Sequence, residues 1–478
     1  MSNSFTLVLK HSNNYLVASI ASSAIAFFSI PVYTFFLKPE EFGIVTLFMS
    51  NVAILSSLMA FSTERSVSRF LYEVKTDNEI KSFVGTSIIT ALVFFTINSF
   101  LISFFAVKFG NFLNLDYRLV YLILPMSGLN IIALLFEQIY TPLRKSKQVA
   151  LSSFLRILLG FGLSLFFLLI VKEDRFYCLI YGQIASGALL CIYYIRVIKL
   201  YFKSSFDILY FNYLFKYSVP LIPYALSGVI IEQFGRVTIG NQLGYKDAGF
   251  YSLTLALGGI VSIVIAVTNQ AWNPFYFEYM NNKNYDSLDN DILRILKITL
   301  VVAFGVGTFG GDLGSLLVKQ DFTSYFYLIP LITIGYVFYQ LSFIYIRNFG
   351  YAKKTIFLSS SFILSGLSNV IFTYYLGNIY GVLGVAISFV ISYMILLVIT
   401  WWINEYFLKL YSTSWVKLIK PLVVVIPFYF ILLVVGFMDN IFLIFGLKAL
   451  SFILLSVLLL GNDLKLAFAV LQTKYFKT

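Results

Sequence analysis

Long apolar runs dominate the sequence and constrain its fold more than any other feature. Segments such as Ser152–Val171 and Leu422–Phe437 are almost continuously apolar. A transmembrane helix needs roughly 20 such residues, whereas the strands of a membrane barrel alternate over about ten. Only 12% of the 478 residues are charged, against roughly a quarter in soluble domains. The sequence therefore predicts an all-α, polytopic membrane protein.

The apolar runs predict about 14 transmembrane helices. We place them at residues 14–37, 42–62, 83–107, 119–140, 149–171, 176–195, 217–237, 248–270, 294–318, 326–346, 355–376, 380–403, 421–437 and 441–461. The longest hydrophilic segments are roughly 20 residues, well short of the 50 or more of a typical domain. We therefore expect the helices and short loops to carry the function.

Lysine and arginine are distributed unevenly between the two sides of the predicted membrane. With the N-terminus in the cytoplasm, 24 of the 34 basic residues lie inside, 7 lie outside, and Arg156, Arg236 and Lys448 fall within spans. This positive-inside pattern predicts that both termini are cytoplasmic. It also explains the net charge of +12 without nucleic-acid binding.

A weak internal repeat relates two parts of the chain at an offset near 206 residues. Lys10 and Lys216 begin the two parts, and Gly43 and Gly249 follow them by the same interval. An offset of six helices preserves orientation, so we predict two parallel six-helix repeats, an architecture found in transporters. The predicted organisation is residues 1–203, residues 204–408, and two additional helices in residues 409–478.

Several short motifs resemble the multidrug/oligosaccharidyl-lipid/polysaccharide exporter superfamily, and within it the O-antigen and polysaccharide flippases. These motifs are Lys216–Pro223, Gly235–Gly240, Ala248–Ser252, Trp272–Phe275 and, in the first half, Pro39–Gly43. The hydropathy resemblance covers essentially the whole chain.

The resemblance implies a flippase in the bacterial inner (plasma) membrane. Its substrate would be an oligosaccharide joined by diphosphate to a polyprenyl lipid, carried from the cytoplasmic to the outer leaflet by alternating access. Membrane lipids and the polysaccharide polymerase machinery are the partners that the family suggests. Buried unpaired charge is costly, so such a headgroup needs a polar path through the bilayer.

Two other functions remain open from the sequence. A cation-coupled drug or metabolite antiporter of the same superfamily would be expected to carry a compact acidic site, whereas few carboxylates lie at mid-membrane here. A membrane glycosyl polymerase usually has a sizeable outer loop with catalytic groups. Each outer loop predicted here has about 15 residues or fewer, little more than the usual upper length of a simple connection. We therefore expect a transporter and not an enzyme.

Arg236 and Glu232 are the first candidate site residues. Ionisable groups within a span are rare and functional by default, and these two stand four residues apart on one helix face. One interpretation places Arg236 on the phosphate path, with Glu232 as its partner or as a proton carrier. The other is an ion pair that reaches the outer interface.

Two further pairs of charged residues are candidates for substrate contact. Glu137 and Arg156 lie at similar distances from the turn between the fourth and fifth helices and could pair across that hairpin. Glu64 and Arg65 end the second predicted helix, which lines the cavity in the family. Structural cross-linking at the inner boundary, or anchoring there, is the alternative in both cases.

No cofactor or metal is predicted from the sequence. His11 is the only histidine, and Cys178 and Cys191 lie on one helix about 20 Å apart by helical rise. The usual ligands of a zinc site are therefore lacking, and no phosphate-cradling loop is found. Asp312 is expected at the outer interface, near the end of the ninth helix.

Overall fold

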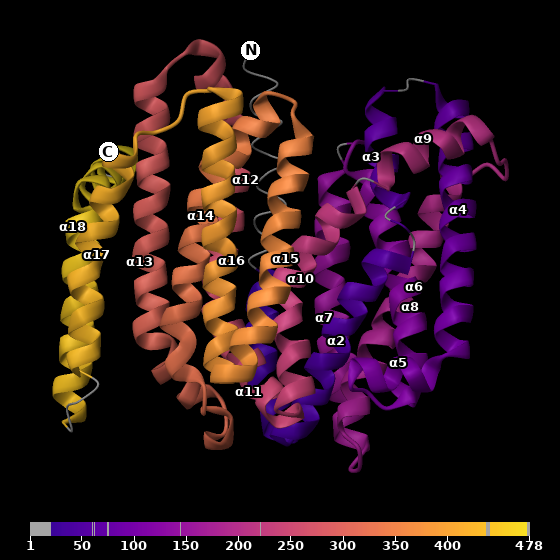
Figure 1. The fold of residues 1–478 in the computed structure, drawn as a ribbon, viewed down its shortest axis with the longest axis horizontal. Coiled ribbons are helices and arrows are strands. Elements are labelled where there is room, and N and C mark those ends of the chain that lie inside the picture. The colour runs from indigo at the N-terminus through magenta and orange to yellow at the C-terminus, as the bar shows by residue number, and fades with distance from the viewer. Residues whose placement is uncertain are drawn as a thin grey trace. The chain divides into compact units, whose positions relative to one another are not determined.

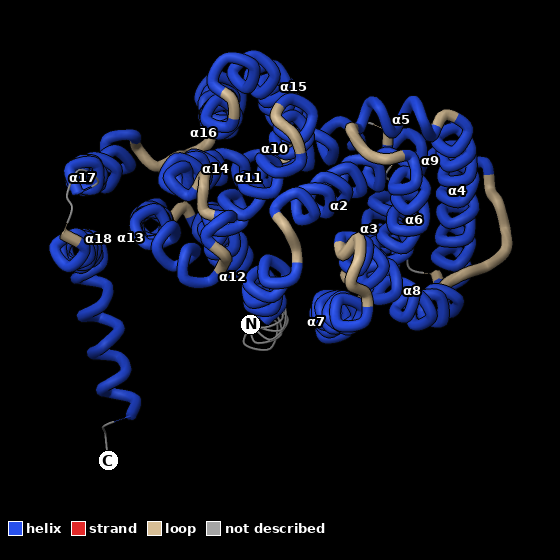
Figure 2. Tube along the Cα trace, turned by 90° about the horizontal axis from the view of Figure 1, so that it is seen from below, coloured by secondary structure: helices blue, strands red, loops and turns tan. Residues whose placement is uncertain are grey.

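The computed structural model describes the backbone of residues 21–59, 61, 63–73, 76–143, 145–219, 221–435 and 440–475. Helices make up almost all of this part of the chain, and none of it lies in a strand, as Figure 2 shows in blue and tan. The prediction of an all-α fold is confirmed.

The helices follow one another with short connections (Figure 1). They are a helix over Ala21–Phe36, then α2 (Pro39–Met59), α3 (Thr63–Glu73), α4 (Asp77–Phe104), α5 (Ala106–Leu113), α6 (Tyr117–Tyr140), α7 (Ser146–Ile170), α8 (Phe176–Leu200), α9 (Ile208–Ser218), α10 (Leu221–Gln242), α11 (Tyr245–Gly258), α12 (Ile260–Asn282), α13 (Tyr285–Leu317), η1 (Gln320–Phe322), η2 (Phe326–Leu328), α14 (Ile329–Tyr351), α15 (Thr355–Tyr380), α16 (Val382–Ile403), η3 (Asn404–Leu408), α17 (Trp415–Val435) and α18 (Ile441–Tyr475).

Among the described residues, 11 helices are long and apolar enough to cross a membrane, or 12 if α9 and α10 form one broken span. The protein is therefore a multi-pass membrane protein. The count of 14 stays a prediction, because the first predicted span begins in residues outside the described part. Only Ala21–Phe36 of that span is described, as a shorter apolar helix.

The chain divides into two compact units. Unit 1 contains the residues up to Ser252 together with Leu317–Phe322 and Phe362–Ser388, and unit 2 contains the remainder. In unit 1, α8 packs against α6 and α7, and α2 packs against α6 and α10. The division into 1–203, 204–408 and 409–478 remains a prediction.

A short amphipathic helix corrects the predicted end of the second span. Residues 63–73 do not continue α2 but form the separate helix α3, because the chain turns at Phe61, whose φ is +52°. Figure 1 shows α3 beside α9 and the beginning of α4. The Phe70 ring stacks on Phe83 of α4 with centroids 3.7 Å apart, and Tyr210 and Tyr213 of α9 meet both rings edge-on.

The seventh predicted span, 217–237, differs from the structure at both ends. In the structure this region forms two helices, α9 and α10, which meet at an angle of 42° and are long and apolar enough to cross a membrane only when taken together. Pro220 falls between them and lies outside the described residues, whereas Pro223 lies in the first turn of α10, where a proline removes no helical hydrogen bond. Gly244, with φ +102°, makes the turn from α10 into α11.

Two glycines allow the first turns of α2 and α11 to touch. A Cβ atom on Gly43 would lie 1.7 Å from the carbonyl oxygen of Tyr245, and one on Gly249 would lie 2.7 Å from the carbonyl oxygen of Pro39. Only glycine permits an approach this close. Both glycines and both carbonyls are related by the 206-residue offset, so the contact is reciprocal.

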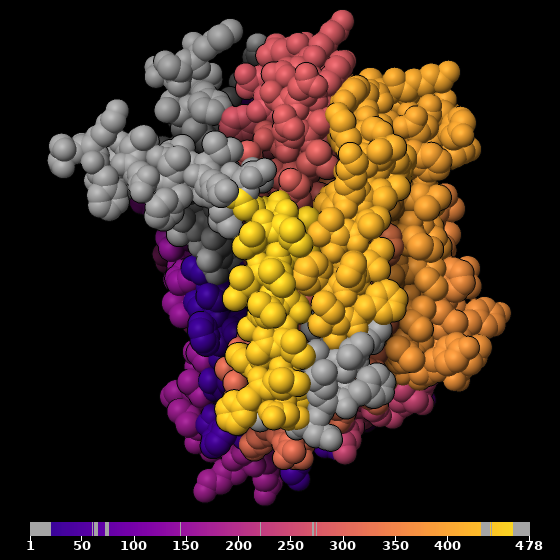
Figure 3. Space-filling view, turned by 90° about the vertical axis from the view of Figure 1, so that its left-hand side faces the viewer, coloured from indigo at the N-terminus to yellow at the C-terminus, as the bar shows by residue number. Residues whose placement is uncertain are grey.

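Unit 2 contains α12, α13, α14 and the last two helices. α17 and α18 pack against each other, and Figure 3 shows them in yellow tones on the surface of this unit. Two ion pairs connect them to α13. Asp289, near one end of α13, contacts Lys417 of α17 at 2.6 Å, and Asp312, near the other end, contacts Lys448 of α18 at 2.7 Å.

Candidate functional site

Arg236 occupies a half-buried position within α10 of unit 1. Its guanidinium donates a hydrogen bond to the Gln233 side chain, and the Gln233 amide oxygen also accepts from the Ser50 hydroxyl of α2 at 2.9 Å. Ser50 is 11 residues from the start of α2, or ~16 Å by helical rise. The 21 residues of α2 span ~30 Å by the same rise, so this polar contact lies near the middle of that helix.

The chemistry around Arg236 suits a phosphate ligand. A guanidinium carries five N–H donors in a planar fork and binds phosphate through two parallel hydrogen bonds. Glu232 is half-buried one turn away, and both charges act on the buried Tyr251 side chain. The structure therefore places Arg236 and Glu232 one turn apart in the second half of α10, and the choice between a substrate contact and an ion pair at the outer interface stays a prediction.

Glu137 and Arg156 are also brought together, by α6 and α7 of unit 1. Arg156 attracts the Glu137 carboxylate, which accepts a hydrogen bond from Ser153. The Arg156 guanidinium itself donates to the Asn130 side chain of α6, and its backbone carbonyl accepts from Ser186 of α8 at 3.0 Å. These bonds connect three helices, and a role of this pair in substrate contact stays a prediction.

Glu64 and Arg65 belong to α3 and not to the end of the second predicted helix. The helix begins at Thr63, so both residues stand in its first turn. Their side chains lie outside the part of the chain that the structure describes.

A second arginine cluster, in unit 2, was missed by sequence reasoning. Arg347 of α14 is only 7% exposed. Its guanidinium donates to the side-chain oxygens of Asn269 and Asn273 on α12 and lies 4.5 Å from the centre of the Trp272 ring. The Asn269 side-chain amide nitrogen also donates a hydrogen bond to the side-chain oxygen of Gln340 of α14 at 3.3 Å. Each observed partner is a neutral amide or an aromatic face, so the cation is held without a carboxylate.

The cluster explains the Trp272–Phe275 motif. Trp272 offers its ring face to Arg347 and donates its indole N–H to Asp291 of α13 at 3.1 Å. Arg347 lies one residue beyond the predicted span 326–346, so it was among the 24 basic residues assigned to the inner side. Gln340 and Arg347, seven residues apart on one face of an apolar helix, were the signal that could have identified it.

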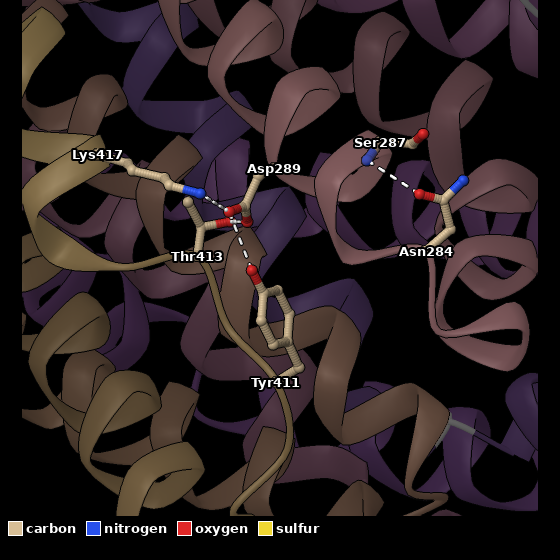
Figure 4. Close-up of polar contacts among 6 residues, drawn as sticks. All are labelled: Asn284, Ser287, Asp289, Tyr411, Thr413 and Lys417. Atoms are coloured by element: carbon tan, nitrogen blue, oxygen red, sulfur yellow. Dashed lines mark hydrogen bonds and ion pairs between the residues drawn. The ribbon is translucent and has the colours of Figure 1, made fainter.

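Asp289 is the centre of a third polar cluster, also in unit 2 (Figure 4). Its side chain is 4% exposed and accepts hydrogen bonds from Tyr411 at 2.9 Å, Thr413 at 2.7 Å and Lys417 at 2.6 Å. Burial, followed by the hydrogen bond to Asp289, raises the pKa of Tyr411 to about 12. This cluster fixes the linker before α17 against the first turns of α13.

Comparison with known proteins identifies a family and a fold. Residues 8–280 match the family described as polysaccharide biosynthesis protein. No curated protein sequence matches the chain.

Three solved structures are similar to this one. The lipid II flippase MurJ, in an inward closed conformation, is 15% identical with a TM-score of 0.70, and the match covers 95% of this chain and 100% of that one. A multidrug resistance MATE family transporter of the MOP superfamily is 12% identical with a TM-score of 0.61, over 82% and 97%. A MOP superfamily transporter from Pyrococcus furiosus is 13% identical with a TM-score of 0.57, over 84% and 94%. The fold is therefore that of the MOP superfamily.

Proposed function

The chain belongs to the polysaccharide biosynthesis protein family, and on that premise we propose that it is a flippase for a lipid-linked saccharide. The substrate is an oligosaccharide joined through diphosphate to a polyprenyl lipid, such as an O-antigen or similar repeat unit. It moves from the cytoplasmic to the outer leaflet of the bacterial inner membrane, and both termini are cytoplasmic. A solved relative of the same fold is a lipid II flippase.

The observation that carries this proposal is the position of Arg236. A half-buried cation within an apolar helix, beside the polar groups of Gln233 and Ser50, is costly unless it binds a ligand. A diphosphate crossing the bilayer needs such a cation, because phosphate loses its hydration there and requires charged hydrogen-bond donors in return. The lipid tail stays in the hydrocarbon.

The contact between Gly43 and Gly249 supports alternating access. It joins the two predicted six-helix halves at their predicted outer ends, through backbone atoms of Pro39 and Tyr245. No side chain intervenes, so the halves can part there without leaving a bulky group in the path. In this proposal the contact closes the outer side while the substrate enters from the cytoplasm, and it opens for release.

Deletion of the gene followed by lipid analysis tests the proposal. A flippase predicts loss of the surface polymer, with its repeat units retained on lipid in the inner leaflet. Complementation with the wild-type chain restores the polymer. A normal surface combined with altered drug tolerance would contradict the proposal and favour an antiporter of the kind represented by the multidrug transporter of this fold. Accumulation of single repeat units on the outer leaflet would instead indicate a polymerase.

A further inference from the structure

An apolar groove crosses the surface of unit 1 between α4, α6 and α8, which Figure 2 shows as neighbours. Its volume is about 330 Å³, at the lower end of the roughly 300–1,000 Å³ range of small-molecule pockets. α4 and α6 each contribute residues at positions i, i+3, i+4 and i+7, which is one helix face ~10 Å long. These are residues 88, 91, 92 and 95 of α4 and residues 128, 131, 132 and 135 of α6, joined by residues 195, 198 and 199 at the end of α8 and by Phe202 just after it.

Small residues create the hollow. Ala91 of α4 and Gly128 of α6 stand where larger apolar side chains would fill the space. The Phe95 ring covers Gly128 so closely that a Cβ atom there would lie 3.0 Å from it. Leu92 and Ile195, at the edge of the groove, are 57% and 42% exposed. Because these helices span the membrane, that exposed edge faces lipid and not water.

The single charged group of the groove lies at one end. Lys199 is exposed on the last turn of α8, at the predicted cytoplasmic side, and no ion-pair partner is found for it among the described residues. Arg196 and Lys203, also exposed, flank it in sequence. Every other lining residue is apolar. The groove thus combines a hydrocarbon surface with a cation at the level of the lipid headgroups.

We propose that this groove binds one acyl chain of an anionic phospholipid of the cytoplasmic leaflet, with its phosphate at Lys199. The acyl chain fills a hollow that helix packing leaves open, and it gains van der Waals contacts with the apolar lining there. The unpaired ammonium selects an anionic headgroup over a zwitterionic one. This site is independent of the proposed substrate path, because it lies on α4, α6 and α8 and not on α10.

Native mass spectrometry of the purified full chain tests the site. The protein is mixed with equal amounts of phosphatidylglycerol and phosphatidylcholine that carry the same acyl chains. We expect the protein to retain on the order of fivefold more phosphatidylglycerol than phosphatidylcholine, because one lysine lies near the headgroup. Lys199→Gln should remove that preference, whereas the control Lys354→Gln, an exposed lysine of the same predicted side in unit 2, should retain it.

Filling the groove is the second arm of the experiment. Ile132→Trp and Gly128→Leu each add bulk to the lining, and both should reduce bound lipid of either headgroup. Two variants are used because Gly128→Leu meets the Phe95 ring and alone could disturb folding. Unchanged phosphatidylglycerol binding in Lys199→Gln and in Ile132→Trp would overturn the proposal. Displacement of phosphatidylglycerol by an equal amount of polyprenyl phosphate would also overturn it, because the groove would then belong to the transport substrate.

Discussion

Arg236 and Arg347 are both arginines within apolar helices, but their surroundings differ. Arg347 is 7% exposed, donates to two asparagines of α12 and lies on the face of Trp272. Arg236 is half-buried and donates to a glutamine of its own helix. The Arg347 guanidinium is therefore enclosed by a neighbouring helix, whereas the Arg236 guanidinium remains partly accessible.

The difference separates two uses of a costly residue. A buried polar network stabilises the fold only when its members are satisfied, and the Arg347 cluster meets that condition for α12 and α14. A partly accessible arginine can still reach a ligand, and an ionisable group within a span is functional by default. We infer that Arg347 serves the structure of unit 2 and that Arg236 serves transport. Each prediction below tests one side of this contrast.

The largest effect on stability is expected for Arg347→Ala. The substitution leaves the side-chain oxygens of Asn269 and Asn273 without their donor and opens a cavity beside Trp272. The combined cost is about 3 kcal/mol or more, which should appear as a large fall in the unfolding temperature in detergent. Arg347→Lys retains the charge but not the planar stack on Trp272. Its unfolding temperature should therefore fall between those of wild type and Arg347→Ala. An unchanged unfolding temperature in Arg347→Ala would contradict the inference that Arg347 stabilises unit 2.

The close contact in unit 1 is tested by Gly43→Ala. The added Cβ atom meets the Tyr245 carbonyl oxygen, which is backbone, so α2 and α11 must separate. We expect a loss of about 1–3 kcal/mol, with easier labelling of a cysteine placed at Pro39. Gly162→Ala of α7 is the matched control, because no atom lies within 4 Å of its Cβ position. An alanine there should stabilise the helix by up to about 1 kcal/mol, so equal behaviour of the two variants would contradict the contact.

Asp289→Asn tests the attachment of the last two helices. The amide removes the charge that Lys417 contacts and turns a donor toward Tyr411 and Thr413, so a cost of about 1–2 kcal/mol is expected. Lys417 is 48% exposed and regains water, which limits the loss. The control is Asp312→Asn, whose carboxylate is 44% exposed in its pair with Lys448. Asp312→Asn should lower the free energy of unfolding by less than Asp289→Asn does. Proteolysis in the 409–414 linker should increase only in Asp289→Asn.

Alkaline pH also tests the cluster around Asp289, with a smaller expected effect on stability. The pKa of Tyr411 is raised from 10 to about 12, so its protonated form contributes stability that is complete below pH 10. This contribution is lost as the pH rises from 10 to 12. Wild type should therefore lose more stability than Tyr411→Phe over this interval. Parallel pH profiles of the two proteins would show that the phenol does not titrate in this way.

The smallest effect on stability is expected for Arg236→Ala. The Arg236 side chain is only half-buried, whereas that of Arg347 is 7% exposed, so the unfolding temperature should fall less than in Arg347→Ala. Transport should nevertheless be lost, with part restored in Arg236→Lys. If Arg236→Ala destabilised the protein as much as Arg347→Ala, both arginines would have a structural role and the contrast between them would be wrong.

The helices and the membrane class could be predicted from the sequence because apolar run length determines both. The contacts between helices could not, since they depend on which faces meet. Arg347 and Asp289 lie outside the predicted spans 326–346 and 294–318, and only the structure places Trp272 beside Arg347 and Tyr411 beside Asp289. The glycines at 43 and 249 were noticed for their spacing, but their mutual contact appears only in three dimensions.

Translocation by the purified protein tests the central claim most directly. The full chain is reconstituted in vesicles with a polyprenyl-diphosphate-linked oligosaccharide, and the fraction reaching the opposite leaflet is measured with a membrane-impermeant glycosidase. The account predicts transfer by wild type, partial transfer by Arg236→Lys and only background transfer by Arg236→Ala. Equal transfer by wild type and Arg236→Ala, or none by wild type under conditions where it is folded, would contradict it.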